Sequence, residues 1–360
     1  MNLARARTDV IVALTWACVA ACGGPQAALT IDAGAADGQT AGASDSGGSH
    51  SDAATGGSSG SSSGSGSGSS SGSGVDAGGP DGASAAQKVC ADNASAYCTH
   101  LQTCAPFLVT ALYGDELTCV SRQMPQCLDA LVAPDTGLTA NELEACVMAQ
   151  TALDCATLLY GKPGPTACHA TGQIAVDGAC RYDAQCGTGY CRLAVGASCG
   201  NCAALGSAGA PCTSFSDCQG SLMCAGSGLC ELPSSIAGPC SSTQPCARGI
   251  SCIKSACVTP GGLGSTCSIQ NGGSDCDYDQ GAYCDPSTST CEAYSVVQSG
   301  APCGGTPPTA CFADGTCFQG ACVGAVQDGA TCNPQSGLNC LPPSSCTAGT
   351  CSFFSAMQCK

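Results

Sequence analysis

The chain is poor in the residue types that build charged surfaces and large cores. Charged residues make up 10% of its 360 residues and aromatic residues 4%, whereas an average soluble domain has about 25% charged residues. Only ten lysines and arginines stand against 26 aspartates and glutamates, which gives a net charge of −16. Nucleic acids and anionic membranes both attract basic surfaces. This balance therefore excludes nucleic acid as a partner and adsorption to anionic lipid.

Histidines and catalytic motifs are also scarce. The chain has three histidines, of which His50 lies in a Gly/Ser-rich segment and His100 and His169 lie in a helical segment. We interpret all three as solvated or structural. No Gly-x-Ser-x-Gly motif stands between a strand and a helix, where a nucleophilic serine would need it. We therefore predict a protein that is not an enzyme and has no cofactor.

Cysteine is the residue type in excess, with 36 of 360 positions. This frequency is typical of a disulfide scaffold, and such scaffolds persist in oxidising compartments. Because large apolar side chains are few, a segment of about 30 residues buries too little surface to fold alone, and cross-links are the usual remedy. We predict an extracytoplasmic, disulfide-rich protein.

Residues 1–21 have the form of a lipoprotein signal peptide. Two arginines precede an apolar stretch at 10–19 that is too short to span a bilayer. The sequence VAAC at 19–22 resembles the bacterial lipobox, the motif at which a signal peptidase cuts before the cysteine and a diacylglycerol is attached to its sulfur. By this resemblance Cys22 is the lipidated N-terminus. The alternative is an ordinary secretory signal cut nearby, with Cys22 as a spare thiol.

The residue after the lipobox and the cysteine count both bear on this interpretation. Gly23 stands where an aspartate would favour retention at the inner membrane, so we expect an outer-membrane address that faces the periplasm or the cell surface. Cleavage removes Cys18 and the lipid occupies Cys22, which leaves 34 cysteines, an even number that can all pair.

Residues 22–83 are predicted to form a disordered linker. The run from Gly56 to Gly74 contains only glycine and serine. Such a segment cannot compensate the entropy lost on ordering, so it acts as a flexible tether. Its root-mean-square span from Cys22 to Cys90 is about 45 Å, which holds the folded part away from the membrane.

Residues 84–170 carry helix signals and are predicted to form a small all-α domain. Capping boxes start at Ser84 and at Thr139. The predicted helices run from 84 to about 104, where Pro106 ends the helix, from about 107 to 131 with a bend near Gly114 and an interruption at Pro125, and from 139 to 160.

Eight cysteines staple this domain. Three pairs of them are eight or nine residues apart, a little over two helical turns, so each pair should lie near one face and bond to a neighbour. Eight cysteines allow 105 connectivities, and the sequence does not choose among them. The pairs are Cys90 and Cys98, Cys119 and Cys127, and Cys146 and Cys155, and the other two cysteines are Cys104 and Cys168.

Residues 178–360 are predicted to form six loop-rich repeats with short β-hairpins. Each repeat begins with a glycine two or three residues before its first cysteine. Within a quartet we predict that the first cysteine pairs with the third and the second with the fourth, and each bridge contributes ~2–4 kcal/mol. The approximate bounds are 178–208, 209–237, 238–263, 264–299, 300–328 and 329–360.

Five repeats contain a cysteine quartet, the first repeat has five cysteines, and one further cysteine stands alone. The cysteines, repeat by repeat, are Cys180, Cys186, Cys191, Cys199 and Cys202; Cys212, Cys218, Cys224 and Cys230; Cys240, Cys246, Cys252 and Cys257; Cys267, Cys276, Cys284 and Cys291; Cys303, Cys311, Cys317 and Cys322; Cys332, Cys340, Cys346 and Cys351; and the lone Cys359. All can pair only if the extra cysteine of the first repeat and Cys359 find partners.

This order of segments resembles a group of cysteine-rich lipoproteins common in myxobacteria, over nearly the full length. The matching stretches are CAPF at 104–107, YGDELTC at 113–119, DGAC at 177–180 and CGTGYC at 186–191. The resemblance implies the architecture and the envelope address, and it implies no activity. The repeats are also similar in cysteine spacing to the N-terminal cysteine-rich domain of Dickkopf proteins, a likeness that implies no ligand.

Two patterns raise the question of redox or metal chemistry. Cys199 and Cys202 have the redox spacing Cys-x-x-Cys, but this loop-rich region has no helix N-terminus or thioredoxin-like sheet to activate a thiol. Zinc and copper sites usually combine several such pairs with histidines, and the chain has one pair. We therefore favour structural disulfides and expect no metal on the cysteines.

Three alternating carboxylates, Asp275, Asp277 and Asp279, are the candidate calcium ligands. In an extended loop all three would point the same way. A calcium loop needs glycine at its sixth position and glutamate at its twelfth, where this chain has Gln280 and Pro286. We favour solvated acidic residues over a calcium site.

Three functions are compatible with these features of the sequence. The favoured one is a non-catalytic display, binding or adhesion scaffold, attached to the membrane through its N-terminal lipid, with an unknown protein or polysaccharide as ligand. The alternative is a disulfide-rich protease inhibitor, for which Ile250 and Lys254 are the possible primary specificity residues. A redox or metal-binding protein is the third hypothesis, which free thiols or bound metal would support.

Overall fold

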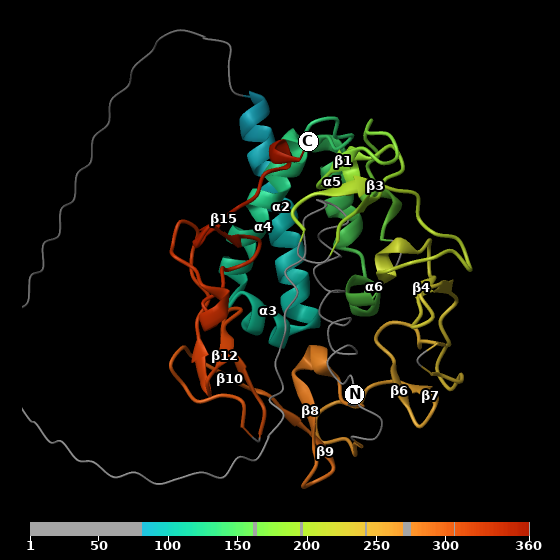
Figure 1. Cartoon of the computed structure of the whole chain (residues 1–360), viewed down its shortest axis with the longest axis vertical. Coiled ribbons are helices and arrows are strands. Elements are labelled where there is room, and N and C mark those ends of the chain that lie inside the picture. The colour runs from blue at the N-terminus through green and yellow to red at the C-terminus, as the bar shows by residue number, and fades with distance from the viewer. Residues whose placement is uncertain are drawn as a thin grey trace, which may run out of the picture. The chain divides into compact units, whose positions relative to one another are not determined.

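The computed structural model describes residues 81–160, 164–194, 197–241, 243–268, 275–305 and 307–359 (Figure 1). The predicted signal peptide, the lipidation site Cys22 and most of the predicted linker at 22–83 lie outside these residues. Among the helices that are described, none combines the length and the apolar character needed to cross a bilayer.

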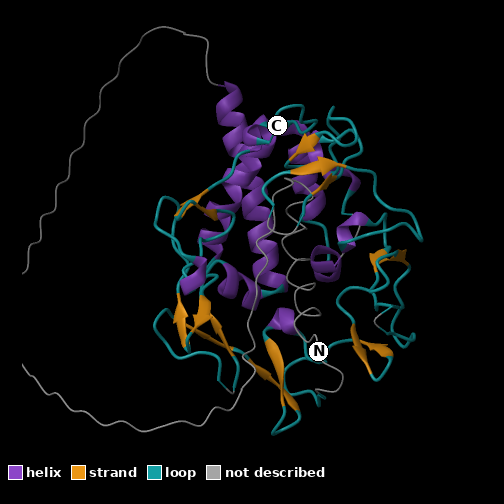
Figure 2. Ribbon diagram, in the orientation of Figure 1, coloured by secondary structure: helices purple, strands orange, loops and turns teal. Residues whose placement is uncertain are grey.

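Five α-helices make up the first part of the described chain (Figure 2, purple). Two clusters of buried side chains pack between them, one around Leu101, Leu108 and Val109 and the other around Ala130 and Leu143. The predicted helical region is thereby confirmed. The helices are α2 (Asp81–Cys104), α3 (Pro106–Leu112), α4 (Glu116–Val132), α5 (Ala140–Gln150) and α6 (Cys155–Tyr160).

Two disulfides staple α2 to α4. Cys90 bonds to Cys127 and Cys98 bonds to Cys119, with Cα–Cα distances of 5.5 and 5.9 Å. The earlier cysteine of α2 pairs with the later cysteine of α4, so the two helices run antiparallel. The prediction that an eight-residue spacing places both cysteines on one helix face is confirmed for these two pairs.

The bend predicted near Gly114 is a complete break between α3 and α4. Gly114 has φ +88°, a left-handed conformation that ends a helix. Asp115 then caps α4, since its carboxylate accepts the backbone N–H of Thr118 at 2.6 Å. This hydrogen bond lowers the pKa of Asp115.

Two other details of the predicted helices are wrong. The first helix is described from Asp81, so the start predicted at Ser84 falls inside it. Pro125 lies inside α4 and does not interrupt it. The disulfides of Cys119 and Cys127 hold α4 on both sides of the proline and offset the hydrogen bond that proline cannot donate.

The third predicted helix is wrong in its extent. Its capping box at Thr139 opens α5 as predicted, but α5 ends at Gln150 and α6 begins separately at Cys155. The break has a local cause, because the carboxylate of Asp154 accepts the backbone N–H of Thr157 at 2.7 Å and so starts a new helix.

This break changes the pairing expected for the last two helical cysteines. Cys146 lies on α5 and Cys155 on α6, so they do not share a helix face. Cys146 bonds to Cys168, in the 3-10 turn at 166–168, and Cys155 bonds to Cys104 at the end of α2. Each therefore ties a different short element to the helices.

Small hairpins follow the helices, in strands of two to four residues (Figure 2, orange). All strand pairs are antiparallel except β10 with β11, which is parallel. The strands are β1 (Ala179–Cys180), β2 (Cys191–Arg192), β3 (Gly200–Cys202), β4 (Met223–Cys224), β5 (Cys230–Glu231), β6 (Ser251–Ile253), β7 (Ala256–Val258), β8 (Ala282–Asp285), β9 (Thr290–Ala293), β10 (Ser295–Val297), β11 (Thr309–Cys311), β12 (Thr316–Phe318), β13 (Ala321–Val323), β14 (Ser345–Thr347) and β15 (Thr350–Ser352).

The predicted disulfide pairing is confirmed in all five quartets. The first repeat follows the same rule once Cys199 is set aside, because Cys180 bonds to Cys191 and Cys186 to Cys202. Cys199 bonds to Cys359, so the two cysteines left over by the repeat pattern pair with each other. The quartet bonds are Cys212–Cys224, Cys218–Cys230, Cys240–Cys252, Cys246–Cys257, Cys267–Cys284, Cys276–Cys291, Cys303–Cys317, Cys311–Cys322, Cys332–Cys346 and Cys340–Cys351.

The disulfides themselves form the cores of the repeats. In each repeat the buried apolar cluster consists almost entirely of cysteines. Five of the clusters have one or two aliphatic side chains packed against them, such as Ile250 in the third repeat. This agrees with the small number of large apolar residues in the sequence and explains why the repeats need two bridges each.

One backbone position explains the glycines that precede the repeats. The residue three positions before the first cysteine has a positive φ in every repeat, and its N–H donates to the carbonyl of the fourth cysteine at 2.7–2.8 Å. Glycine adopts this conformation without strain. Where glycine stands one residue later, the position is filled by another residue type. The six residues are Asp177, Gly209, Ala237, Gly264, Gly300 and Gly329.

The rest of each repeat is built on the same frame. The N–H of the fourth cysteine donates back to the residue two positions before the first cysteine, at 2.8–2.9 Å in all six repeats. The residue six positions before the first cysteine pairs in parallel with the second cysteine, as Ile174 does with Cys186. Each repeat is therefore a hairpin with a third, leading segment laid along it.

At the positive-φ position, replacing glycine by alanine should lower the local stability of a repeat, and replacing alanine by glycine should raise it. Gly209→Ala places a Cβ in open space but forces alanine to φ near +80°, at a cost of about 1 kcal/mol. Ala237→Gly removes the same strain from the third repeat. Hydrogen exchange of the Cys230 and Cys257 amides measures the two effects, and a change of the same sign in both variants would contradict the assignment.

Candidate functional site

All 34 cysteines between Cys90 and Cys359 are bonded in 17 disulfides. Catalysis and metal ligation by cysteine both need a thiolate. The described residues therefore contain no cysteine that can serve either purpose while these bonds persist. Sulfur atoms do gather in the repeat cores, as at Cys180, Cys186 and Cys191, but they belong to disulfides.

The Cys-x-x-Cys motif is not a redox pair in the structure. Cys199 bonds to Cys359 and Cys202 bonds to Cys186. The motif therefore contains one cysteine of the repeat frame and one cysteine that ties the first repeat to the end of the described chain.

The three calcium candidates do not share an extended loop. Asp275 accepts the backbone N–H of Ser268 at 2.8 Å, as a brace within the fourth repeat. Asp277 caps the 3-10 turn η5 (Tyr278–Gln280), and Asp279 lies within that turn. The favoured interpretation of all three as solvated acidic residues is wrong for Asp279, which is buried. Asp275 and Asp277 each accept backbone N–H groups of their own repeat.

The braces can be compared between repeats. Asp217 stands one residue before the second cysteine of the second repeat, as Asp275 does in the fourth, and it accepts the backbone N–H of Thr213 at 2.7 Å. Thr213 and Ser268 each follow the first cysteine of their repeat. The acidic residue at this position thus ties the first half of a repeat to its second cysteine.

The histidines of the described chain occupy separate places. His169 Nε2 lies 3.1 Å from the carbonyl oxygen of Gly164, within one short turn. His100 is half-buried on α2, near the disulfide of Cys104 and Cys155. That each is solvated or structural stays a prediction.

The two candidate specificity residues of a protease inhibitor do not lie in an extended exposed loop. Lys254 is exposed, but it and Ser255 form the two-residue turn between β6 and β7, with φ 50° and 63°. Ile250 is half-buried against the disulfide cluster of its repeat. A substrate-like loop is extended so that it can pair with the edge of a protease cleft, and a tight turn of this kind is not.

The arginines have a role that the sequence did not indicate. Each of the four in the described chain contacts a second module. Arg122 of α4 contacts the sixth repeat, Arg192 of the first repeat bonds to Asp217 of the second, and Arg248 of the third repeat lies over the ring of Phe215 of the second at 4.0 Å. The arginines are scattered along the sequence because each one joins a different pair of modules.

Arg122 makes the largest of these contacts. Its guanidinium forms a bidentate pair with Asp328 at 2.7 and 2.8 Å and donates to the carbonyls of Leu341 and Pro342 and to the hydroxyl of Ser344. The hydrogen bonds from Arg122 lower the pKa of Asp328. All three nitrogens of this buried guanidinium thereby donate to residues between 328 and 344.

Arg181 and Asp129 form a second buried polar centre, between α4, the first repeat and residues 353–359. Asp129 accepts hydrogen bonds from the hydroxyl of Tyr182 at 2.6 Å and from the backbone N–H of Ala356 at 2.8 Å. Arg181 is fully buried and lies 3.9 Å from the same carboxylate. Burial raises the pKa of Tyr182 far above its ordinary range. An acidic residue in the last turn of a helix is unfavourable by itself, and this was the only sequence signal.

The fourth and fifth repeats contact α3. Phe107 packs against Tyr278 and Tyr294 of the fourth repeat, with ring centroids 5.5 Å apart in each case. The backbone N–H groups of Ala313 and Asp314 donate to carbonyls at the end of α3, at 3.2 and 2.6 Å. These donors satisfy carbonyls that a helix C-terminus leaves unpaired.

A cleft of about 280 Å³ lies where α3 and α4 meet the fifth and sixth repeats. It combines two aromatic rings with amide and hydroxyl groups and one carboxylate. A small, partly polar site of this kind suits one group of a larger ligand better than a whole cofactor. Its lining includes Tyr113, Asp115, Thr118, Gln298, Phe312 and Gln327.

Comparison with known proteins adds no relative. No model of a known protein family, no curated protein and no solved structure matches the chain.

Replacing Arg122 should loosen the sixth repeat. Lysine keeps the charge but cannot form the bidentate pair with Asp328, so Arg122→Lys should lower the free energy of local opening of residues 329–351 by about 1–3 kcal/mol. Arg192→Lys is the matched control, because that side chain is 47% exposed. Hydrogen exchange followed by mass spectrometry compares them, and equal protection in the two variants would refute the role of Arg122.

The contacts of α3 should weaken as the pH rises. Burial raises the pKa of Asp279 to about 6 and that of Asp314 to about 8, from an ordinary value of 3.8. The folded chain holds these protons more tightly than the unfolded chain, so the stability from the two groups is complete below about pH 4 and falls as the pH rises through 6 and 8.

The measurement is thermal unfolding between pH 5 and 9, a window above the range in which the carboxylates with lowered pKa titrate. The variant with both Asp279→Asn and Asp314→Asn should lose most of the fall in stability. An unchanged fall in this variant would show that other groups cause it.

Proposed function

We propose that the chain is a non-catalytic scaffold of the bacterial cell envelope, held by a lipid on Cys22 and acting by display, binding or adhesion. The observation that carries the proposal is that every cysteine from Cys90 to Cys359 is in a disulfide. Such a network is typical of proteins that fold outside the reducing cytosol. The described chain is therefore cross-linked throughout and has no free thiol for catalysis or metal ligation.

The contacts between modules favour a rigid scaffold over a chain of modules that move independently. The first, fourth, fifth and sixth repeats each bond to the helices, through Asp129, Gln280, Asp314 and Arg122 respectively. A surface of fixed geometry loses little entropy on binding. Cross-links also limit the unfolding that exposes a chain to proteases.

The cleft between the helices and the last two repeats is the proposed contact for a ligand group. Its chemistry favours a polysaccharide over a protein. Sugar rings pack on aromatic faces, here that of the half-buried Phe312, and their hydroxyls bond to amides such as those of Gln298 and Gln327. A volume of about 280 Å³ suits one sugar residue.

The anchor is tested by changing Cys22. In the native bacterium the unaltered protein should remain with the outer-membrane fraction and be labelled by an impermeant biotin reagent on intact cells. Cys22→Ser should release it from the membrane without changing its disulfides. A Cys22→Ser protein that stays membrane-bound would refute the lipid anchor, and an unlabelled wild-type protein would place it on the periplasmic side.

The cleft is tested by binding to a polysaccharide array. The variant with both Gln298→Ala and Gln327→Ala should bind any captured polysaccharide at least about tenfold more weakly, since two hydrogen bonds are lost. Gln219→Ala, an exposed glutamine of the second repeat, should bind as the unaltered protein does. Equal binding by the unaltered protein and both variants would show that the polysaccharide binds elsewhere.

A further inference from the structure

The disulfide of Cys199 and Cys359 differs from the others of the described chain in burial and in connectivity. Neither of its cysteines is buried, whereas each other disulfide contains at least one buried cysteine. It joins residues 160 positions apart, and the next largest separation is 51, between Cys104 and Cys155. It therefore lies outside both the helical staples and the repeat cores.

The repeat disulfides are kept closed by the strands that carry them. In every repeat backbone hydrogen bonds hold the leading segment, which carries the first cysteine, against the hairpin that carries the third and fourth. In the third repeat, for example, the N–H of Cys240 donates to the carbonyl of Ser255 at 3.0 Å. A thiolate released there stays close to its former partner and attacks again, because its effective concentration is high. Cys359 belongs to no strand and follows the 3-10 turn η7 (Ala356–Gln358).

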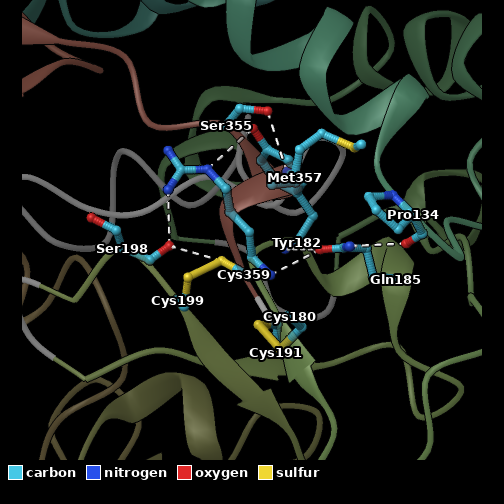
Figure 3. Close-up of a disulfide and its surroundings, with 12 residues drawn as sticks. Pro134, Cys180, Tyr182, Gln185, Cys191, Ser198, Cys199, Ser355, Met357 and Cys359 are labelled. Carbon is cyan, nitrogen blue, oxygen red and sulfur yellow. Dashed lines mark hydrogen bonds between the residues drawn. A yellow bond between two sulfur atoms is a disulfide. The ribbon is translucent and has the colours of Figure 1, made fainter.

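A buried cation lies beside this disulfide. Arg181 Nη1 donates to the carbonyl of Ser198 at 2.9 Å, and Cys359 Sγ lies 3.7 Å from the same oxygen (Figure 3). The nearest carboxylate to Arg181, that of Asp129, is 3.9 Å away. A nearby positive charge stabilises a thiolate, and a thiol with a lower pKa leaves a disulfide faster.

We propose that Cys199–Cys359 is a thiol-exchange site for low-molecular-weight thiols. The thiolate of the small thiol attacks one of the two sulfurs and forms a mixed disulfide with that cysteine. The S–S bond breaks, and the other cysteine leaves as a thiolate that takes up a proton from water. No oxidant is needed, because the electron pair of the broken bond stays on the leaving sulfur.

Exchange at this site releases Cys359 from Cys199 and leaves the neighbouring contacts in place. Ser355 and Ala356 remain bonded to Asp129, and Arg181 remains over the rings of Phe353 and Phe354. The result is a cysteine adduct at a defined place, with the six repeats still closed by their own disulfides. The site is thus a modification site within a scaffold that keeps its fold.

The test is incubation of the purified, oxidised protein with reduced glutathione, quenching by acid, and mapping of adducts by mass spectrometry. The first adduct should appear on Cys199 or Cys359, at least about tenfold faster than on any other cysteine. The internal comparison is Cys240–Cys252, because Cys252 is exposed but belongs to a repeat. The variant with both Cys199→Ser and Cys359→Ser should form no early adduct.

Three results would overturn the proposal. A first adduct on Cys252 would mean that exposure alone decides reactivity, whatever the connectivity. Adducts that appear on many cysteines at the same rate would mean that exchange follows global unfolding and that no site is selected. An early adduct that persists in the double variant would likewise assign the reactivity to other cysteines.

Discussion

In each repeat two crossed disulfides replace an apolar core, and the other features of the repeats follow from them. A segment of about 30 residues with few large apolar side chains cannot bury enough surface to fold. The bond from the first cysteine to the third and from the second to the fourth ties a leading segment to a hairpin. That segment must turn sharply to reach the fourth cysteine, and the positive φ three residues before the first cysteine provides the turn.

Because the repeats are stapled internally, their polar and aromatic side chains are available for contacts between modules. Arg122, Arg181, Arg192 and Arg248 each lie at such a contact, in a chain with only ten basic residues. Buried arginines need several partners to offset desolvation, and these partners fix the helices and the repeats in one arrangement. A binding scaffold benefits from this rigidity, since little ordering remains to be done when a ligand binds.

Much of this architecture was predictable because cysteine spacing and glycine position are local signals. The quartets implied their own pairing, and the capping box at Thr139 located a helix start. The break at Asp154 was missed, because an N-cap inside an apolar stretch looks like a polar position on a longer helix. The contacts of Asp129 were not predictable, since they join residues 53 to 227 positions apart and no local pattern encodes them. The repeat pattern left one cysteine of the first repeat and Cys359 over, but it did not show that they pair across 160 positions.

The most direct test of this account is a disulfide map of the natural protein, digested without reduction in the presence of an alkylating reagent. None of the 34 cysteines from Cys90 to Cys359 should be alkylated. Each repeat should yield peptides joined from first to third and from second to fourth cysteine. Free thiols within the repeats, or bonds between neighbouring cysteines of one hairpin, would contradict it and reopen the question of metal or redox chemistry.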